Sequence, residues 1–282
     1  MQTVLSAFKF ICLHMRQYFG QAHNMHGVRM KQINIKNIAI GKGMPKICIP
    51  VVAKNIDEVK SQAEEIAALP VDLIELRGDF LENYLESTYA VDAIKEIKKI
   101  ADVPVIYTFR TAREGGEQDI SSVQYETLLK KILGSGMAEL IDVEMFSGDD
   151  LVKDVIAYAH KCGTHVIVSN HDFENTPIKI EIISRLVKMQ VLGADIAKIA
   201  VMPNSKEDVL TLLQATLFAY EQYMDIPVIT MSMARDGMIS RMAGEIFGSC
   251  ITFGAAKKAS APGQIHAGEL AKILEIIHNS TK

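Results

Sequence analysis

Short apolar runs and amphipathic stretches alternate along the chain from about residue 47 to its end. The apolar runs are typical of strands buried on both faces of a sheet; they are Ile47–Val52, Val71–Leu76, Val103–Phe109, Ala138–Val143, His165–Ser169, Ile196–Val201, Pro227–Met231 and Cys250–Phe253. Between them, apolar residues recur at helical spacing; these stretches are Ile56–Leu69, Val91–Ile100, Val123–Leu133, Leu151–His160, Ile178–Val191, Val209–Tyr220 and Leu270–Ile277. The seventh gap, around Ile239–Phe247, is short but can hold a helix.

Strands that alternate with helices indicate an α/β fold with a parallel sheet. Eight strands favour one closed (β/α)8 TIM barrel, which commonly takes about 250 residues. A doubly wound open sheet is the alternative that the pattern leaves open. No GxGxxG turn and no GxxxxGK motif occurs, so the chain carries no nucleotide-binding signature. Ahead of the first strand, the alternating stretch Ile33–Ile40 predicts a short strand or hairpin.

Residues 1–29 lie outside this pattern. They hold three basic residues and no acidic one, and their apolar run is too short and interrupted to span a membrane. This composition would allow a transit peptide. We favour a start at Met30, because the chain reads as a self-consistent domain from there. We therefore expect residues 1–29 to be a disordered leader or a mis-assigned start, and residues 30–282 to form the catalytic barrel domain.

Composition and charge narrow the partners. With 49% hydrophobic residues, 23% charged residues and a net charge of −4, the chain is typical of globular proteins, and no basic stripe suggests nucleic acid. The histidines and the four cysteines show no spacing that suggests a metal site or a disulfide framework. Unpaired cysteines fit the reducing cytoplasm. We expect a cytoplasmic protein with neither a nucleic-acid nor a membrane partner.

The chemistry of such a barrel lies where its strands end. The predicted strand ends carry a series of polar and sulfur-containing residues: Glu75-Leu-Arg77, Thr108-Phe-Arg110 with Glu114 beyond it, Asp142-Val-Glu144, Ser169-Asn-His171-Asp172, Lys198 within its strand, Met231-Ser-Met233, and Phe253 followed by Ser260-Ala-Pro-Gly-Gln264.

Lys198 is the most informative of these residues, because apolar strand residues flank it on both sides. Loss of hydration disfavours the charged form of an amine, and a neutral amine can attack a carbonyl carbon. The alternative is a structural lysine paired with a strand-end carboxylate such as Glu75 or Glu144. The pattern alone leaves both interpretations open.

His171 is a candidate proton shuttle, because imidazole titrates near neutral pH. Asp172 is a poor candidate to orient it, since adjacent strand residues point to opposite faces. Glu114 could reach His171 from its loop, although most glutamates are simply exposed. Arg77, Arg110 and Arg241 could each hold an anion through the planar guanidinium, and Glu75 could equally pair with Arg77. Met231 and Met233 favour pocket packing over chemistry.

Taken together, these strand ends resemble the type I 3-dehydroquinate dehydratases. The resemblance runs from about Ile35 to Leu274, with the motifs in the order of the family. Its motifs are Glu75-Leu-Arg77, Thr108-Phe-Arg110, Glu114-Gly-Gly-Glu117, Ser169-Asn-His171-Asp-Phe173, Lys198-Ile-Ala-Val-Met-Pro203, Met231-Ser-Met233, Ser240-Arg241 and Ser260-Ala-Pro-Gly-Gln264.

The resemblance implies a TIM barrel, usually a homodimer, that removes water from 3-dehydroquinate in the shikimate pathway of aromatic amino-acid biosynthesis. It implies that Lys198 forms the Schiff base, His171 moves the proton and Glu114 orients His171. It also implies that Arg241 clamps the substrate carboxylate. The remaining candidates for substrate binding are Glu75, Arg77, Arg110, Ser260, Gln264, Met231, Met233 and Phe253. No metal and no organic cofactor are expected.

Two departures from the family pattern stand out. Pro50 occupies a position where some members have a serine near the substrate, so no role is assigned to it. Ala234-Arg-Asp-Gly237 replaces a turn that is commonly richer in glycine. A class I aldolase-like lyase would share Lys198 but would give no reason for the His171 and Arg241 set. A non-catalytic barrel that binds sugar acids is the other alternative.

Overall fold

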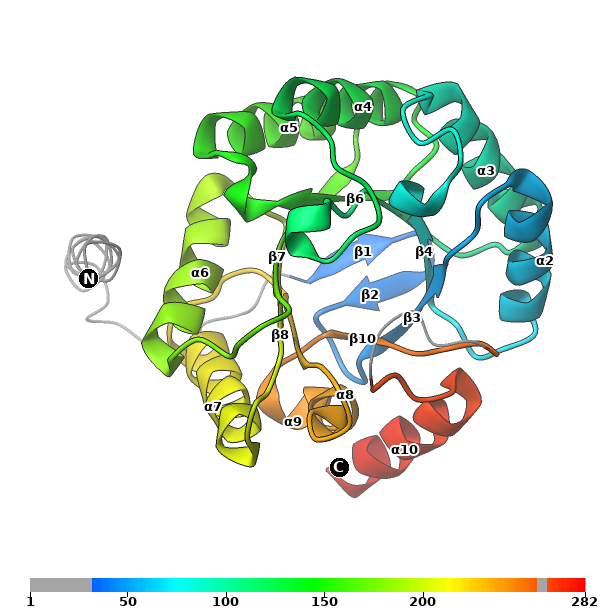
Figure 1. The fold of residues 1–282 in the computed structure, drawn as a ribbon. Coiled ribbons are helices and arrows are strands. Elements are labelled where there is room, and N and C mark those ends of the chain that lie inside the picture. The colour runs from blue at the N-terminus through cyan, green and yellow to red at the C-terminus, as the bar shows by residue number, and fades with distance from the viewer. Residues whose placement is uncertain (1–31, 258–262, 282) are drawn as a thin grey trace.

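The computed structural model describes residues 32–257 and 263–281, and Figure 1 views its ring of strands end-on. The strands of the main sheet follow one another in the order β10-β3-β4-β5-β6-β7-β8-β9, and every pair is parallel. They are β3 (Lys46–Val51), β4 (Leu73–Arg77), β5 (Val105–Thr108), β6 (Leu140–Glu144), β7 (His165–Asp172), β8 (Ile196–Val201), β9 (Val228–Ser232) and β10 (Ile251–Phe253).

The two edge strands meet and nearly close the barrel. Val228 at the start of β9 forms a parallel bridge with Ser249 just before β10. The amide of Cys250 also donates to the carbonyl of Val228 over 2.8 Å. The TIM barrel expected from the sequence is confirmed, and the open-sheet alternative is wrong.

Helices surround the strands on the outside (Figure 1). The longer ones are α2 (Ile56–Ala67), α3 (Ser87–Ile100), α4 (Ser122–Gly134), α5 (Asp149–Lys161), α6 (Lys179–Leu192), α7 (Lys206–Gln222) and α10 (Ala267–Ser280). The short seventh gap holds two small helices, α8 (Met238–Met242) and α9 (Gly244–Phe247). Among the described residues, no helix combines the length and apolar character that crossing a membrane requires.

Polar cues set several helix starts. Ser121 is the N-cap of α4 and Ser205 is the N-cap of α7, and each forms a capping box with the residue three positions on, Gln124 and Asp208. Such reciprocal bonds satisfy backbone amides that the first helical turn leaves without partners. Gly193 ends α6 in the left-handed conformation that glycine adopts most easily.

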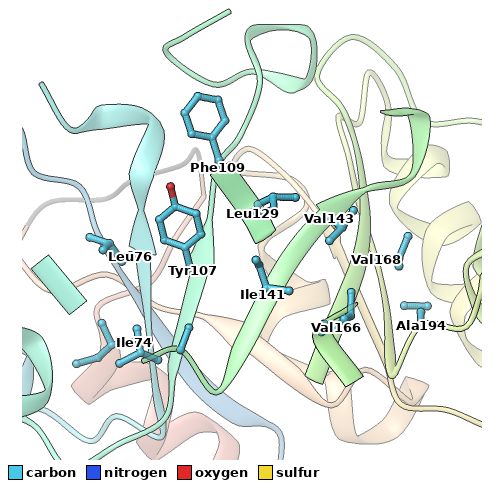
Figure 2. Close-up of a cluster of buried hydrophobic side chains, with 14 of the residues drawn as sticks. Ile74, Leu76, Tyr107, Phe109, Leu129, Ile141, Val143, Val166, Val168 and Ala194 are labelled. Carbon is cyan, nitrogen blue, oxygen red and sulfur yellow. The ribbon is translucent and has the colours of Figure 1, made fainter. Parts of the chain in front are cut away.

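Alternation along the strands divides the core in two. Outward-facing residues such as Ile74, Tyr107 and Val143 pack in the layer between strands and helices, as Figure 2 shows. Residues that face inward form a second cluster inside the barrel. It includes one residue from each of five neighbouring strands: Leu73, Ile106, Leu140, Ile167 and Ile196.

A hairpin closes the base of the barrel. Strands β1 (Ile33–Ile35) and β2 (Ile38–Ile40) pair antiparallel, and Figure 1 shows them behind the ring of barrel strands. Ile33, Ile35 and Ile40 are buried in the inner cluster. The predicted hairpin is confirmed, and it removes the N-terminal end of the barrel from water.

One residue layer above the inner apolar cluster, the barrel interior turns polar. The next inward-facing positions on β4 to β8 are Glu75, Thr108, Asp142, Ser169 and Lys198, and all are buried. Strand β7 also continues to Asp172, three residues beyond its predicted end, and its last residue pairs with Val201 of β8. An apolar run does not reveal this end, because the residues that extend the strand are polar.

Candidate active site

A cavity of about 190 Å³ lies among the carboxyl ends of the barrel strands. Every candidate residue from the sequence that the structure describes lines it: Glu75, Arg77, Arg110, Glu114, His171, Lys198, Met231, Met233, Arg241, Phe253 and Gln264. Ser260 lies outside the described residues. The alternation of the strands and the loops that follow them thus bring these scattered motifs to one place.

Lys198 lies at the base of this cavity and is 3% exposed. Its Nζ atom is 3.3 Å from Asp142 Oδ2 and 3.5 Å from Glu75 Oε1, and it sits 4.6 Å from the centre of the Phe253 ring. The expected carboxylate pairing thus involves Glu75 but not Glu144. Two carboxylates stabilise an ammonium group, so loss of hydration is not the only influence on this amine.

Glu144 has other partners, which explains why Lys198 does not meet it. Its carboxylate accepts hydrogen bonds from Arg110 Nη1 at 3.0 Å, from the Thr111 amide at 2.8 Å and from the Thr111 hydroxyl at 2.7 Å. These bonds tie the end of β6 to the loop after β5.

His171, at the end of β7, meets Glu114 through Nδ1, which lies 3.1 Å from Glu114 Oε2. The same carboxylate oxygen accepts from the His171 amide at 2.9 Å. Burial lowers the pKa of His171 well below its usual value, and the charges of Arg110, Lys198 and Arg77 add to that effect. At neutral pH the imidazole is therefore neutral, the form that can accept a proton.

Glu114 sits at the end of a single 3₁₀ turn, Ala112–Glu114, and is buried. Gly115 follows with φ of 82°, and a Cβ atom there would lie 2.3 Å from the Phe173 ring. Burial raises the pKa of Glu114 to about 7, although Arg110 opposes the shift. Asn170 Nδ2, 3.3 Å away, contacts the carboxylate oxygen that His171 leaves free.

Asp172 turns away from this pair, as strand alternation predicts. Its carboxylate accepts from the amides of Glu174 and Asn175 in the loop after β7. The sequence argument against Asp172 as the group that orients His171 is confirmed by this geometry.

Arg110 is 3% exposed and is held by several partners at once. It donates to Asp142 Oδ1 at 2.8 Å, to Glu144 Oε1 at 3.0 Å and to Ser169 Oγ at 3.0 Å. The nearby carboxylates outweigh burial and raise the pKa of the guanidinium well above its usual value. Arg110 therefore serves first as a fixed positive charge among the carboxylates.

Arg77 does not pair with Glu75, contrary to the suggestion from the sequence. Its Nε and Nη2 atoms donate to the two oxygens of Asp79, at 2.9 and 2.7 Å. Glu75 instead accepts from the Thr108 hydroxyl at 2.8 Å and faces Lys198. Asp79 lies in the short turn after β4, close enough to grip the arginine side chain in two places.

Arg241 enters the cavity from α8 and is 2% exposed. Burial lowers its pKa to about 10, which still leaves it charged at neutral pH. Its Nη1 lies 3.6 Å from the sulfur of Met231. A buried guanidinium in a cavity wall is suited to hold a carboxylate through two parallel hydrogen bonds.

Sequence reasoning left some of the lining without a role. Pro50, Thr108, Ala200 and the aromatic rings of Phe80 and Phe173 also face the cavity. Thr108 and Phe173 were visible within the quoted motifs, but their residue types gave no chemical signal. Asp142 and Asp79 were harder to assign, because their importance depends on which cations the fold brings to them.

The turn that departs from the family pattern adopts an uncommon conformation. Ala234 has φ of 56°, in the left-handed region that residues with a side chain rarely occupy. A Cβ atom on Gly263 would lie 2.1 Å from the Ala234 carbonyl oxygen. The loops after β9 and β10 therefore touch at the edge of the cavity.

Comparison with known proteins agrees with this geometry. A model for the family described as type I 3-dehydroquinase matches residues 47–281. The 3-dehydroquinate dehydratase of Clostridioides difficile strain 630 is 49% identical over 258 residues, covering 89% of this chain and 98% of that protein. The protein of the same name from Bacillus licheniformis is 50% identical over 251 residues, covering 89% and 99%.

A solved structure is also similar. It is the type I 3-dehydroquinate dehydratase of Clostridium difficile with covalently modified comenic acid. It matches with a TM-score of 0.87 and 49% identity, and covers 89% of this chain and 100% of that chain.

Proposed function

Because the chain belongs to the type I 3-dehydroquinase family, we propose that Lys198, His171 and Glu114 carry the reaction of that family in this protein. The chain is a 3-dehydroquinate dehydratase, a hydro-lyase of the shikimate pathway that converts 3-dehydroquinate to 3-dehydroshikimate and water by Schiff-base catalysis. The aldolase-like and non-catalytic alternatives are therefore set aside. The position of Lys198 at the base of the cavity is the observation that carries the assignment of residues.

Lys198 forms the Schiff base. In its neutral form the amine attacks the ketone carbon, and the carbonyl oxygen takes up a proton to give a carbinolamine. Loss of water then leaves a protonated imine between Lys198 and the substrate. Its positive nitrogen withdraws electrons from the neighbouring carbon, which makes a proton on that carbon easier to remove.

His171 removes this proton and later returns one to the departing hydroxyl group. The electron pair of the broken C–H bond forms the new double bond as the hydroxyl leaves as water. Glu114 accepts the hydrogen on Nδ1, so Nε2 is left with the lone pair that takes the substrate proton. Water then attacks the imine carbon, which frees the product and regenerates the Lys198 amine.

The charged walls fix the substrate. Arg241 holds the substrate carboxylate, since its guanidinium is buried in the wall and charged. Glu75, Arg77 and Arg110 contact ring hydroxyls, with Ser260 and Gln264 on the eighth loop, while Met231, Met233 and Phe253 supply apolar contact. Arg77 is suited to this, because Asp79 fixes its guanidinium before the substrate arrives.

Borohydride trapping tests the role of Lys198. Borohydride adds hydride to a protonated imine, so incubation with 3-dehydroquinate should give a stable adduct at Lys198 that intact mass and peptide mapping detect. The adduct should be missing in Lys198→Ala. Lys188→Ala, which changes a lysine on α6 that pairs with Asp149, should still form it. An adduct on any other lysine would contradict the assignment.

His171→Ala tests the proton shuttle in the same assay. This variant should still form the trapped imine, because its lysine is intact. It should lose about 100-fold or more in kcat, the usual contribution of a positioned acid–base group. Absorbance of the conjugated product measures turnover. Full activity in His171→Ala would remove His171 from the mechanism.

We also propose a cytoplasmic homodimer. The described cysteines, Cys48, Cys162 and Cys250, are free, as expected in a reducing compartment. Helices α6 and α7 pack on one another and expose Val191, Leu210 and Phe218, apolar residues that a second subunit could cover. Light scattering after size-exclusion chromatography would test the assembly, with a mass of twice the 31.2 kDa chain expected.

A further inference from the structure

We propose that Asp142 is the counter-ion of the protonated imine on Lys198 and that it acts from beneath the cavity as a positioning residue. This inference rests on the proposed role of Lys198. Asp142 is fully buried on β6, one strand layer below the mouth of the cavity. It therefore influences the reacting nitrogen without being part of the described cavity lining.

The hydrogen bonds of Asp142 aim one of its oxygens at Lys198. Its Oδ1 atom accepts from Ser169 Oγ at 2.6 Å and from Arg110 Nη2 at 2.8 Å. The other oxygen, Oδ2, lies 3.3 Å from Lys198 Nζ. Two donors on one side thus fix the carboxylate, so its charge needs no rearrangement when the lysine nitrogen becomes positive.

Asp142 also stays ionised where it is. Burial works against its ionisation, but Arg110, Lys198 and the Ser169 hydroxyl outweigh it and hold the pKa of this carboxyl below its usual value. A carboxylate that remains charged in a water-poor interior acts over short distances with little screening. It can therefore serve as a lasting partner for the charge that forms above it.

Glu75 is less suited to this task. Its Oε1 atom is farther from the nitrogen, at 3.5 Å, and also accepts from Thr108 at 2.8 Å. It lines the cavity, so an arriving substrate hydroxyl can compete for its oxygens. Asp142 is not part of the described cavity lining, so a substrate hydroxyl has no direct access to its oxygens.

The charge on the nitrogen explains what a counter-ion would achieve. The free amine and the carbinolamine are neutral at nitrogen, whereas the imine acts as an electron sink only after protonation. Formation of the protonated imine consumes one amine, one ketone and one proton, and it releases one water. A fixed negative charge beside the nitrogen favours this protonated product over the neutral imine.

Other groups near the nitrogen determine which part of a pH profile reports on the imine. The titratable groups that interact with Lys198 from the surrounding strands are Cys48, Glu75, Asp142 and His171. The fixed charges of Arg77 and Arg110 act on His171 as well. Burial raises the pKa of Cys48, which keeps it a neutral thiol. His171 and Glu114 change protonation at or below neutrality, so the alkaline side of the profile reports on the imine.

The test is Asp142→Asn, in which an amide replaces the carboxylate without changing its shape. Trapping by borohydride with 3-dehydroquinate is measured over a pH series. Trapping should be lost at high pH, where the imine loses its proton. In Asp142→Asn we expect the midpoint of this loss to lie about 1 to 3 pH units lower than in the wild type, the usual effect of removing a close opposite charge. The KM should change less than kcat, because Asp142 lies beneath the cavity rather than against the substrate.

Two matched variants separate this role from a structural one. Glu144→Gln removes a different buried carboxylate from the same Arg110, so it disturbs the arginine but leaves the charge beside Lys198. Its alkaline loss of trapping should coincide with that of the wild type. Asp150→Asn removes an exposed negative charge in the first turn of α5 and should also leave the pH profile of trapping unchanged.

The outcomes are distinct. An unchanged alkaline limb in Asp142→Asn, or an equal shift in Glu144→Gln, overturns the counter-ion role while trapping in the wild type still supports Lys198. If even the wild type gives no adduct at Lys198, the proposed function itself fails. Should Asp142→Asn not fold, Asp142→Ser removes the same charge and keeps a hydroxyl for Ser169 and Arg110. The same measurement, the loss of trapping at alkaline pH, then decides the role of Asp142.

Discussion

At the scale of single residues, burial moves two neighbouring groups in opposite directions. It raises the pKa of Glu114 to about 7 and lowers that of His171 well below its usual value. Burial is the main cause of both shifts, because a water-poor environment penalises the charged form of an acid and of a base alike. The pair is thus kept near its neutral forms until the pH reaches about 7, where Glu114 ionises and can accept the hydrogen on His171 Nδ1.

Replacing Glu114 by Gln should therefore change both stability and activity with pH. The folded protein binds the Glu114 proton more tightly than the unfolded chain does, so wild-type stability should fall relative to Glu114→Gln as the pH rises from about 4.5 to about 7. Above about pH 7 the difference in the free energy of unfolding between the two proteins should stay constant. Denaturant unfolding at a series of pH values measures it.

The same variant should lose the acid limb of kcat/KM near pH 7, at a lower overall rate. In the wild type, a protonated Glu114 would donate to Nδ1 and leave the hydrogen on Nε2, where it blocks proton abstraction. If the free energies of unfolding of the wild type and of Glu114→Gln differ by the same amount at every pH, Glu114 does not titrate between about pH 4.5 and 7.

At the scale of elements, short loops owe their precision to a few contacts with the strand ends. Asp79 accepts from Arg77 and also from the backbone amides of Arg110, at 3.3 Å, and Glu117, at 3.2 Å. It therefore connects the turn after β4 with the loop that carries Glu114. Gly116 is needed in that loop, because a Cβ atom there would lie 1.9 Å from the Arg110 carbonyl oxygen.

The turn at Ala234 offers a prediction at this scale. Its φ of 56° is unfavourable for an L-residue, so Ala234→Gly should stabilise the protein by up to about 1 kcal/mol once the greater freedom of glycine in the unfolded chain is subtracted. Thermal unfolding measures the change. Ala68→Gly, at a C-cap with φ of −83°, is the control and should destabilise by up to about 1 kcal/mol. Equal effects of the two substitutions would rule out relief of strain.

At the scale of the whole molecule, the barrel is divided into layers with different tasks. The hairpin and the lower inner layer are apolar and hold the strands together. The polar layer above them is a mutually satisfied set of carboxylates and cations, in which Arg110, Asp142 and Lys198 are linked directly. The apolar base keeps water from the polar layer, and the polar layer supplies the chemistry.

Two shortened chains should separate residues 1–29 from the hairpin. We expect a chain that starts at Met30 to keep the melting temperature and activity of the full chain, because it retains the hairpin and every strand of the barrel. A chain that starts at Met44 also lacks Ile33, Ile35 and Ile40. It should be less stable by several kcal/mol, since each buried isoleucine contributes about 1.5–3 kcal/mol. Equal stability of the two chains would contradict a structural role for the hairpin.

The sequence by itself determined the barrel, the hairpin and the positions of the catalytic candidates. Periodicity reports burial directly, so eight apolar runs with helices between them favoured a closed barrel. The strand ends that carry Glu75, Arg77, His171 and Lys198 were then expected to meet at one end of it, and the structure shows that they do. The motifs of Lys198 and His171 were also specific enough to indicate the family.

Only the tertiary structure decided which charges meet. The sequence allowed Arg77 to pair with Glu75, but Arg77 instead holds Asp79. For Lys198 it offered Glu75 or Glu144, and the structure shows Glu75 together with Asp142. Pairing depends on side-chain reach across strands that are far apart in the chain, with Asp142 lying 56 residues from Lys198. A one-dimensional pattern records which face a residue is on, but the partner it finds there is fixed by strand stagger and loop geometry in three dimensions.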